Sequence, residues 1–161
     1  MTVDTRDFRD TLGNFVTGIT VITTVGPDEE PVGITANSFN SVSLDPPLIL
    51  FSLARTAYSL AAFTNHRHFA VNILKEGQEE ISNRFAMRSG DKWTGIDHTK
   101  WDSGCPILMD AMAVLECRLR NTYDGGDHLI FVGEVLRLFN ETEGRPLVYH
   151  RGRYCCLRDA S

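Results

Sequence analysis

The chain has 161 residues, of which 42% are hydrophobic and 23% charged, with a formal net charge of -5 at pH 7. This length and composition are typical of a globular protein, so residues 1–161 are expected to form a single domain. The acidic balance argues against nucleic acid as a partner, and no run of about 18 apolar residues predicts a membrane span.

An amphipathic helix is predicted at residues 5–15, because Phe8, Leu12 and Phe15 recur at helical spacing. Gly18 is expected to stop this helix. The segments that follow are rich in β-branched or apolar residues and predict a hairpin and a further strand, at residues 19–25, 32–37 and 48–53.

Pro46 and Pro47 predict an extended bend before the strand at 48–53, and Thr56 is a candidate N-cap for a short helix. A strand at 69–74, a helix at 77–85 and an irregular segment at 87–110 are expected next. Strands near 115–120 and 129–139 should flank a turn at 123–128, and a short pair of strands is expected at 147–150 and 153–157. Seven or so strands with short helices between them predict an antiparallel barrel of the Greek-key type.

The four cysteines lack the Cys-x-x-Cys spacing of zinc ribbons and thioredoxin-like redox pairs. Cys117 alternates with Glu116 and Arg118 and is interpreted as a small core residue, whereas Cys155 and Cys156 are adjacent and are expected to point to opposite faces of a strand. The N-terminus has no secretory signal pattern, so a reducing, cytoplasmic location is expected.

One run of the sequence carries more small polar residues than a buried strand needs: Thr35, Ala36, Asn37 and Ser38 end the second strand of the hairpin. Uncharged donors and acceptors suit a neutral heteroaromatic ring with imide and carbonyl edges. The alternative is a strand end whose side chains cap their own backbone.

Arg55, Thr56 and Ser59 stand where a helix is expected to begin, and the amides there favour an anion such as phosphate. The alternative is a plain N-cap with an arginine in solvent. His128, beside the "GGDH" turn, is a candidate acid or base, ligand contact or surface residue. His66 and His68 lack a third ligand nearby in the sequence, so no metal site is predicted.

Taken in order, the motifs of this chain resemble those of the short-chain flavin reductases, the reductase components of two-component flavin-dependent monooxygenases. The segments that carry the resemblance, within residues 6–157, are "FRDTLGNFVTGITVITT" (8–24), "GITANSFNSVSLDPPLILFSLA" (33–54), "FAVNIL" (69–74), "NRFA" (83–86), "DKWTGI" (91–96), "GCPIL" (104–108), "GGDHLIFVGEV" (125–135) and "PLVYHRGRY" (146–154). Residues 93–95 depart from it, reading Trp-Thr-Gly where Phe-Ala-Gly is commoner.

The resemblance implies a mainly β, Greek-key split barrel with short peripheral helices. It implies a homodimer that binds FMN or FAD near the subunit interface, takes hydride from NADH or NADPH, and passes reduced flavin to a partner monooxygenase. Hydride moves from nicotinamide C4 to flavin N5 when the rings stack, so no side chain is expected to act as an acid or base.

The resemblance also implies site residues. Those expected near the flavin ring and ribityl chain are Thr35, Ala36, Asn37 and Ser38. Those expected near the ribityl chain and phosphate are Ser52, Leu53, Ala54 and Ser59. Those expected near the phosphate or the adenosine end are Phe85, Ala86 and Arg88, and His128 is expected to contact the nicotinamide nucleotide.

Other functions remain open on the same barrel, because a fold does not fix a function. One is a non-catalytic flavin-binding protein. Others are an oxidase of a pyridoxine-like compound, whose substrate phosphate has only Arg55 and Arg88 as obvious basic partners, and a ferric reductase.

Overall fold

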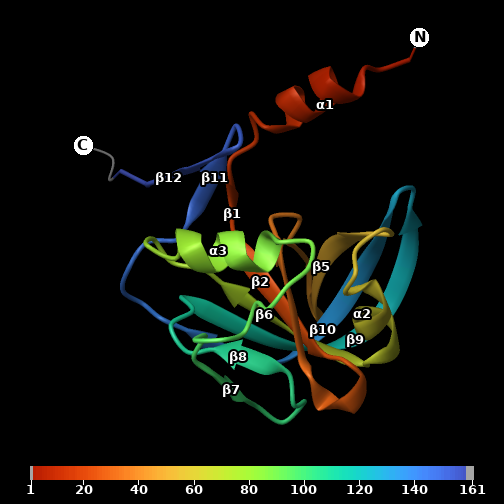
Figure 1. Cartoon of the computed structure of the whole chain (residues 1–161), viewed down its shortest axis with the longest axis vertical. Helices are drawn as coiled ribbons and strands as arrows, with labels where there is room; N and C mark the ends of the chain where they lie inside the picture. The colour runs from red at the N-terminus through yellow and green to blue at the C-terminus, as the bar shows by residue number, and fades with distance from the viewer. Residues whose placement is uncertain (1, 159–161) are drawn as a thin grey trace.

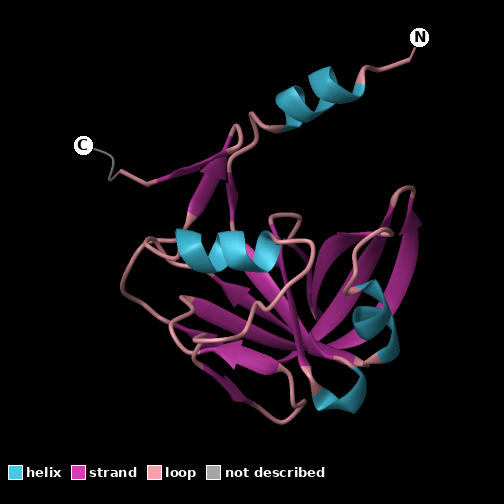
Figure 2. Cartoon of the chain, viewed as in Figure 1, coloured by secondary structure: helices cyan, strands magenta, loops and turns pink. Residues whose placement is uncertain are grey.

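The computed structural model describes residues 2–158, and most of its regular structure is β (Figure 2). Three short α-helices lie at the periphery: α1 (Thr5–Leu12), α2 (Leu60–Asn65) and α3 (Glu79–Ala86). A single turn of 3-10 helix, η1 (Pro27–Glu29), joins two strands. The expectation of a mainly β fold with short peripheral helices is confirmed.

Within the described residues there are twelve strands. They are β1 (Thr17–Gly18), β2 (Thr20–Val25), β3 (Pro31–Ala36), β4 (Asn40–Leu44), β5 (Pro47–Ala54), β6 (His68–Ile73), β7 (His98–Lys100), β8 (Pro106–Leu108), β9 (Ala113–Gly125), β10 (His128–Asn140), β11 (Val148–His150) and β12 (Arg153–Cys155).

Seven of these strands form one curved antiparallel sheet, in the order β3-β2-β6-β9-β10-β5-β4 (Figure 1). Strands that are distant in sequence lie next to one another, as in a Greek key. Because β3 and β4 do not pair with each other, the barrel is split between them. Two small sheets, β1-β11-β12 and β7-β8, complete the fold.

Four phenylalanines from different elements fill the centre of the barrel. The rings of Phe51 and Phe131 stack with centroids 4.9 Å apart, and Phe69 meets Phe51 edge-on at 5.1 Å. Phe63 of α2 closes the cluster at 5.7 Å from Phe51. Alternation along β5 turns Phe51 inward, and such aromatic pairs add stability beyond their buried area.

Gly133 makes the close packing of this cluster possible. A Cβ at Gly133 would lie 2.3 Å from the ring of Phe69, which is itself 2% exposed. The β10 to β9 register shifts between Val132 and Gly133, so a bulge lies at the same place. The ring of Phe69 therefore occupies the space that any larger residue would need.

Several local expectations are wrong. Helix α1 ends at Leu12 with Gly13 as its C-cap, and Gly18 lies in β1 instead of stopping the helix. Thr56 is not an N-cap, because α2 begins after Ser59, whose side chain makes no capping hydrogen bond. The segment 87–110 is less irregular than expected, since it contains β7 and β8.

Glu116 is also misplaced by the alternating pattern, which puts it on the polar face of its strand. It is 2% exposed and accepts hydrogen bonds from the N–H and hydroxyl of Ser103, at 2.9 and 2.6 Å. Its neighbour Cys117 is fully buried, as expected. Both faces of β9 are covered here because the segment before β8 folds over the outer face.

Helix α1 projects away from the barrel, and none of its residues is buried (Figure 1). Its apolar residues Phe8 and Leu12 are 52% and 56% exposed, and Phe15, which follows the helix, is 77% exposed. The amphipathic helix is thus present, although it is shorter than the predicted 5–15 and its apolar residues do not pack on their own chain. No helix in the described part of the chain is long and apolar enough to cross a membrane.

Gly133→Ala is expected to lower the free energy of unfolding by about 1–3 kcal/mol, because the new methyl group must displace the ring of Phe69. Urea denaturation followed by circular dichroism measures the change. Gly18→Ala is the control, since nothing lies within 4 Å of a Cβ at that position, and it should stay within about 0.5 kcal/mol of the wild type. Equal stability of the two variants would contradict this account of the core.

Candidate functional site

The polar residues that end β3 hold three elements together. The hydroxyl of Thr35 donates to the carbonyl of Ser82 in α3 at 2.6 Å. The hydroxyl of Ser38 donates to the carbonyl of Ser52 in β5 at 3.1 Å and accepts from its N–H at 3.0 Å. These side chains therefore bond to the backbone of other elements and not, as the alternative from sequence proposed, to their own.

On one side of β3 lies a cavity of about 690 Å³, called here the Lys92 hollow. It is lined by residues 30–34 of β3 and the turn before it, by residues 54 and 56–59 before α2, and by residues 86–93 after α3. Four of the sequence-predicted site residues meet in it: Ala54, Ser59, Ala86 and Arg88. Its remaining wall is largely apolar, with Val32, Ile34, Ala57 and Trp93.

Lys92 was not a predicted site residue, yet its ammonium group is the most enclosed cation of this hollow. Nζ donates to the carbonyls of Phe85 at 3.0 Å and of Gly33 at 3.4 Å. Burial lowers the pKa of the Lys92 ammonium. Hydrogen bonds from the side chain of Thr94 and from the amides of residues 94 and 93 hold the pKa of the preceding Asp91 carboxyl below its ordinary value.

Two of the residues expected near the flavin have side chains that are buried in the core. Phe85 is fully buried, with its ring against Gly33 and 4.8 Å from the ring of Trp93. Leu53 is 3% exposed and belongs to the central cluster. These two side chains pack behind the residues that line the cavity, so only the backbone of Phe85 and Leu53 is available to a ligand. Ala36 and Ser52 are half-buried on their strands.

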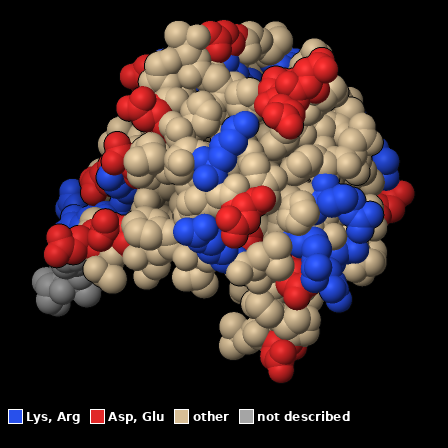
Figure 3. All heavy atoms as spheres, turned by 90° about the horizontal axis from the view of Figure 1, so that it is seen from below, with Lys and Arg blue, Asp and Glu red and all other residues tan. Residues whose placement is uncertain are grey.

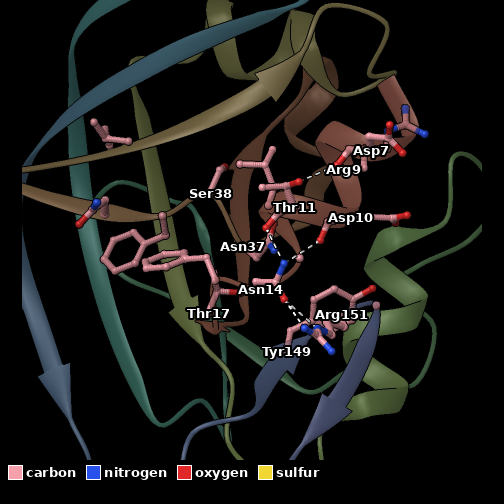
Figure 4. A pocket seen from close by; sticks show the side chains of 17 residues that line it. Asp7, Arg9, Asp10, Thr11, Asn14, Thr17, Asn37, Ser38, Tyr149 and Arg151 are labelled. Atoms are coloured by element: carbon pink, nitrogen blue, oxygen red, sulfur yellow. Dashed lines mark hydrogen bonds between the residues drawn. The ribbon is translucent and has the colours of Figure 1, made fainter. Parts of the chain in front are cut away.

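On the other side of the same strand end lies a larger groove, of about 1340 Å³, between α1, the β11-β12 turn and the β3-β4 loop (Figure 4). It is called here the Asn14 groove. Asn37 and Ser38 line it. Asn14 donates to the carbonyls at the end of α1 and accepts from the guanidinium of Arg151, so it joins α1 to the β11-β12 turn.

Thr17 also lines the Asn14 groove, and its hydroxyl is buried without a hydrogen-bond partner among the described residues. A buried hydroxyl without a partner is uncommon in a folded protein. Sequence analysis missed Asn14, Thr17 and Arg151, because a lone polar residue in a strand or turn carries no motif.

His128 lies at the start of β10, directly opposite Ala54 of β5 in the strand register. Its Nδ1 is 2.7 Å from the carboxylate of Asp127, which leaves Nε2 as the ring nitrogen free to contact a ligand. The hydrogen bond to His128 also lowers the pKa of the Asp127 carboxyl. The histidine is therefore held next to the strand end that borders the Lys92 hollow.

Arg55 fastens the turn that carries His128. Its Nε donates to the carbonyl of Gly126 at 2.8 Å, and its guanidinium pairs with Asp124 at 3.1 Å. Its backbone N–H donates to the carbonyl of Asp127 at 2.9 Å. The side chain of Arg55 is thus engaged with the hairpin, which argues against its use as an anion ligand at the start of α2.

Figure 3 shows one face of the molecule, on which basic and acidic side chains are interspersed. The described residues of this face therefore form no extended basic surface of the kind that binds nucleic acid. Among the described residues, no group of three or more His, Cys, Asp or Glu side chains is arranged to hold a metal ion. The chemistry of the site thus rests on the two cavities and the hairpin.

Comparison with known proteins places this geometry in context. A family model described as "Flavin reductase like domain" matches residues 12–158. The reductase subunit HsaB of a flavin-dependent monooxygenase from Rhodococcus jostii is 44% identical over 152 residues, which cover 94% of this chain and 77% of that protein. The FMN reductase (NADH) SmoA from Agrobacterium fabrum is 43% identical over 151 residues, covering 94% of this chain and 85% of that protein.

A solved structure agrees over the whole fold. The NADH:FAD oxidoreductase SgcE6 from Streptomyces globisporus, in complex with NAD and FAD fragments, superposes with a TM-score of 0.91 and 38% identity. The alignment covers 98% of this chain and 97% of that one.

Arg55→Met is expected to loosen the β9-β10 turn, because it removes the hydrogen bond to Gly126 and the ion pair with Asp124. Amide hydrogen exchange in residues 122–130 should become about threefold faster, a small factor because the ion pair is exposed. Arg6→Met, on the exposed face of α1, should leave this exchange unchanged. Unchanged exchange in Arg55→Met would show that the guanidinium does not hold the turn.

Proposed function

This chain belongs to the flavin reductase like domain family, and we propose that it reduces FMN or FAD with NADH or NADPH. The observation that carries the proposal is the position of residues 35–38. Ile34 lines the Lys92 hollow and Asn37 and Ser38 line the Asn14 groove, while Thr35 and Ala36 connect them along the chain and line neither cavity. The proposal is that one elongated ligand follows the strand end between the two cavities.

The residues present fit a flavin. The Lys92 hollow has apolar walls for part of a planar ring system and the cations Arg88 and Lys92 for an anionic end. The Asn14 groove offers the exposed, uncharged amide of Asn37 for imide and carbonyl edges. The proposed placement puts the phosphate end toward Ser59 and Arg88.

A bound flavin supplies the hydride acceptor for the nicotinamide nucleotide. The chain itself binds and orients. Thr35 and Ser38 fix the strand end through the backbone bonds described above, and the buried side chains of Leu53 and Phe85 keep the walls rigid. His128, oriented by Asp127, contacts the nicotinamide nucleotide through Nε2. No proton transfer by a side chain is required, so catalysis rests on positioning.

The reduced flavin is proposed to pass to a monooxygenase component, as the name of the relative HsaB indicates for that protein. The proposal treats residues 1–161 as one flavin-binding domain, of which residues 1 and 159–161 lie outside the described part. All four cysteines are free, which supports a reducing compartment such as the cytoplasm.

A homodimer is part of the proposal. The exposed apolar face of α1 continues into the Asn14 groove, because Leu12 and Phe15 line that groove. A second copy that covers this face would bury Phe8 and Leu12 of α1 and Phe15 after it, and would enclose the groove. The expected site near a subunit interface follows from the same arrangement.

The proposed activity is tested by the oxidation of NADH by the purified protein, with and without added FMN, FAD or riboflavin. Turnover that depends strictly on added or bound flavin is the expected result. Saturable flavin binding without turnover would leave a non-catalytic flavin-binding protein, and neither binding nor turnover would reject the proposal.

His128→Ala is expected to raise the KM for NADH or NADPH about fivefold, the worth of one hydrogen bond, while kcat changes less than twofold. Steady-state kinetics at saturating flavin measure both values. The KM for flavin is the internal control and should not change. Equal falls in kcat and kcat/KM, with KM unchanged, would contradict the role given to His128.

Phe15→Asp is expected to weaken the dimer at least about tenfold, because a carboxylate would replace a buried ring at the interface. Folding should be preserved, since Phe15 is 77% exposed in the single chain. Sedimentation velocity over a range of concentrations measures the association. Met109→Asp, at another exposed apolar residue directly after β8, is the control. A Phe15→Asp dimer as tight as the wild type would exclude Phe15 from the interface.

A further inference from the structure

The ammonium group of Lys92 is a half-buried cation without an anion beside it. Lys92 forms no ion pair with any described Asp or Glu. Its two recorded partners, the carbonyls of Phe85 and Gly33, are neutral. An ammonium group has three donors, so one N–H remains for a further acceptor.

Such an arrangement costs free energy unless something compensates the charge, because burial disfavours the charged form of lysine. The lowered pKa of Lys92 is the sign of that cost. Carboxylates do line the rim of the same hollow, at Glu30 and Asp91. The carboxylate of Asp91 accepts hydrogen bonds from the amides of residues 93 and 94. Neither the Glu30 nor the Asp91 carboxylate forms an ion pair with Lys92. Lys92 therefore has no direct ion-pair partner among the described residues, although two carboxylates line the same hollow.

A second cation and two hydroxyl groups border the same space. Arg88 is exposed and makes no hydrogen bond or ion pair with the described residues. Thr56 and Ser59, before α2, also line the hollow, and their side chains make no hydrogen bond within the described chain. Cations together with unbonded hydroxyl groups suit a phosphate, whose oxygens accept charge-assisted hydrogen bonds.

We propose that Lys92 binds the flavin phosphate, with Arg88 as a second cation, and that this contact makes the protein select phosphorylated flavins over riboflavin. The inference rests on the proposed function. It adds Lys92 to the residues that the sequence indicated for the phosphate end, and it gives that residue the main role in selection because it is the more enclosed of the two cations.

A purely structural role for Lys92 predicts something different. Its bonds to Phe85 and Gly33 also tie the segment after α3 to β3. If that were its only role, its loss would weaken all flavins alike. Riboflavin has the same ring and ribityl chain as FMN but no phosphate, so a comparison of the two ligands separates the roles.

The test measures equilibrium binding of riboflavin, FMN and FAD by the quenching of flavin fluorescence. The wild type should bind FMN or FAD at least about tenfold more tightly than riboflavin. Lys92→Met should weaken binding of the preferred phosphorylated flavin about tenfold and that of riboflavin less than twofold. Lys92→Arg, which keeps the charge, should retain most of the preference. Lys100→Met, a control in the exposed strand β7, should behave as the wild type.

Two results would overturn the inference: equal affinity of the wild type for riboflavin and FMN, or a loss in Lys92→Met that is the same for both. Circular dichroism and thermal unfolding of Lys92→Met establish that it is folded. If it is not, Lys92→Arg and Arg88→Met, together with the salt dependence of FMN binding by the wild type, decide the question. Absence of flavin-dependent NADH oxidation in the wild type would contradict the proposed function but not this binding result.

Discussion

The pairing of β10 with two neighbours is the constraint on which the site depends. β10 is bonded to β9 on one side and to β5 on the other, over most of its 13 residues. This register sets His128 opposite Ala54 and Ile130 opposite Ser52. A slip of one residue would turn Phe131 out of the aromatic core, so the packing at the centre of the barrel fixes the position of the histidine at its edge.

The small polar residues at the end of β3 and directly after it have two separate roles. Thr35 and Ser38 are structural, because their hydroxyls fasten the strand end to α3 and β5. Asn37 is exposed in the Asn14 groove, where its amide is available to a ligand. One sequence motif thus combines residues that hold the backbone still with a residue that faces the proposed ligand, which suits a reaction governed by positioning.

The sequence predicted the structure correctly where the spacing of apolar residues reflected burial against the core alone. Cys117 is buried as its alternation predicts, and α3 (Glu79–Ala86) lies close to the helix predicted at 77–85. The environments of Glu116 and Lys92 could not be predicted, because they depend on tertiary hydrogen bonds to Ser103 and to the carbonyl of Gly33 that the local pattern does not indicate. The N-cap predicted at Thr56 was wrong for the same reason. The neighbouring Arg55 bonds to the distant β9-β10 turn, and α2 begins later in the chain.

The split in the barrel leaves β3 and β4 as sheet edges, and such edges are templates on which another chain can add a strand. Proline begins β3 at Pro31, so this position offers no N–H to an incoming strand. Along β3, α3 and the bond from Lys92 to the carbonyl of Gly33 cover the backbone. The β3 edge of the split is therefore protected against the addition of a strand from another chain.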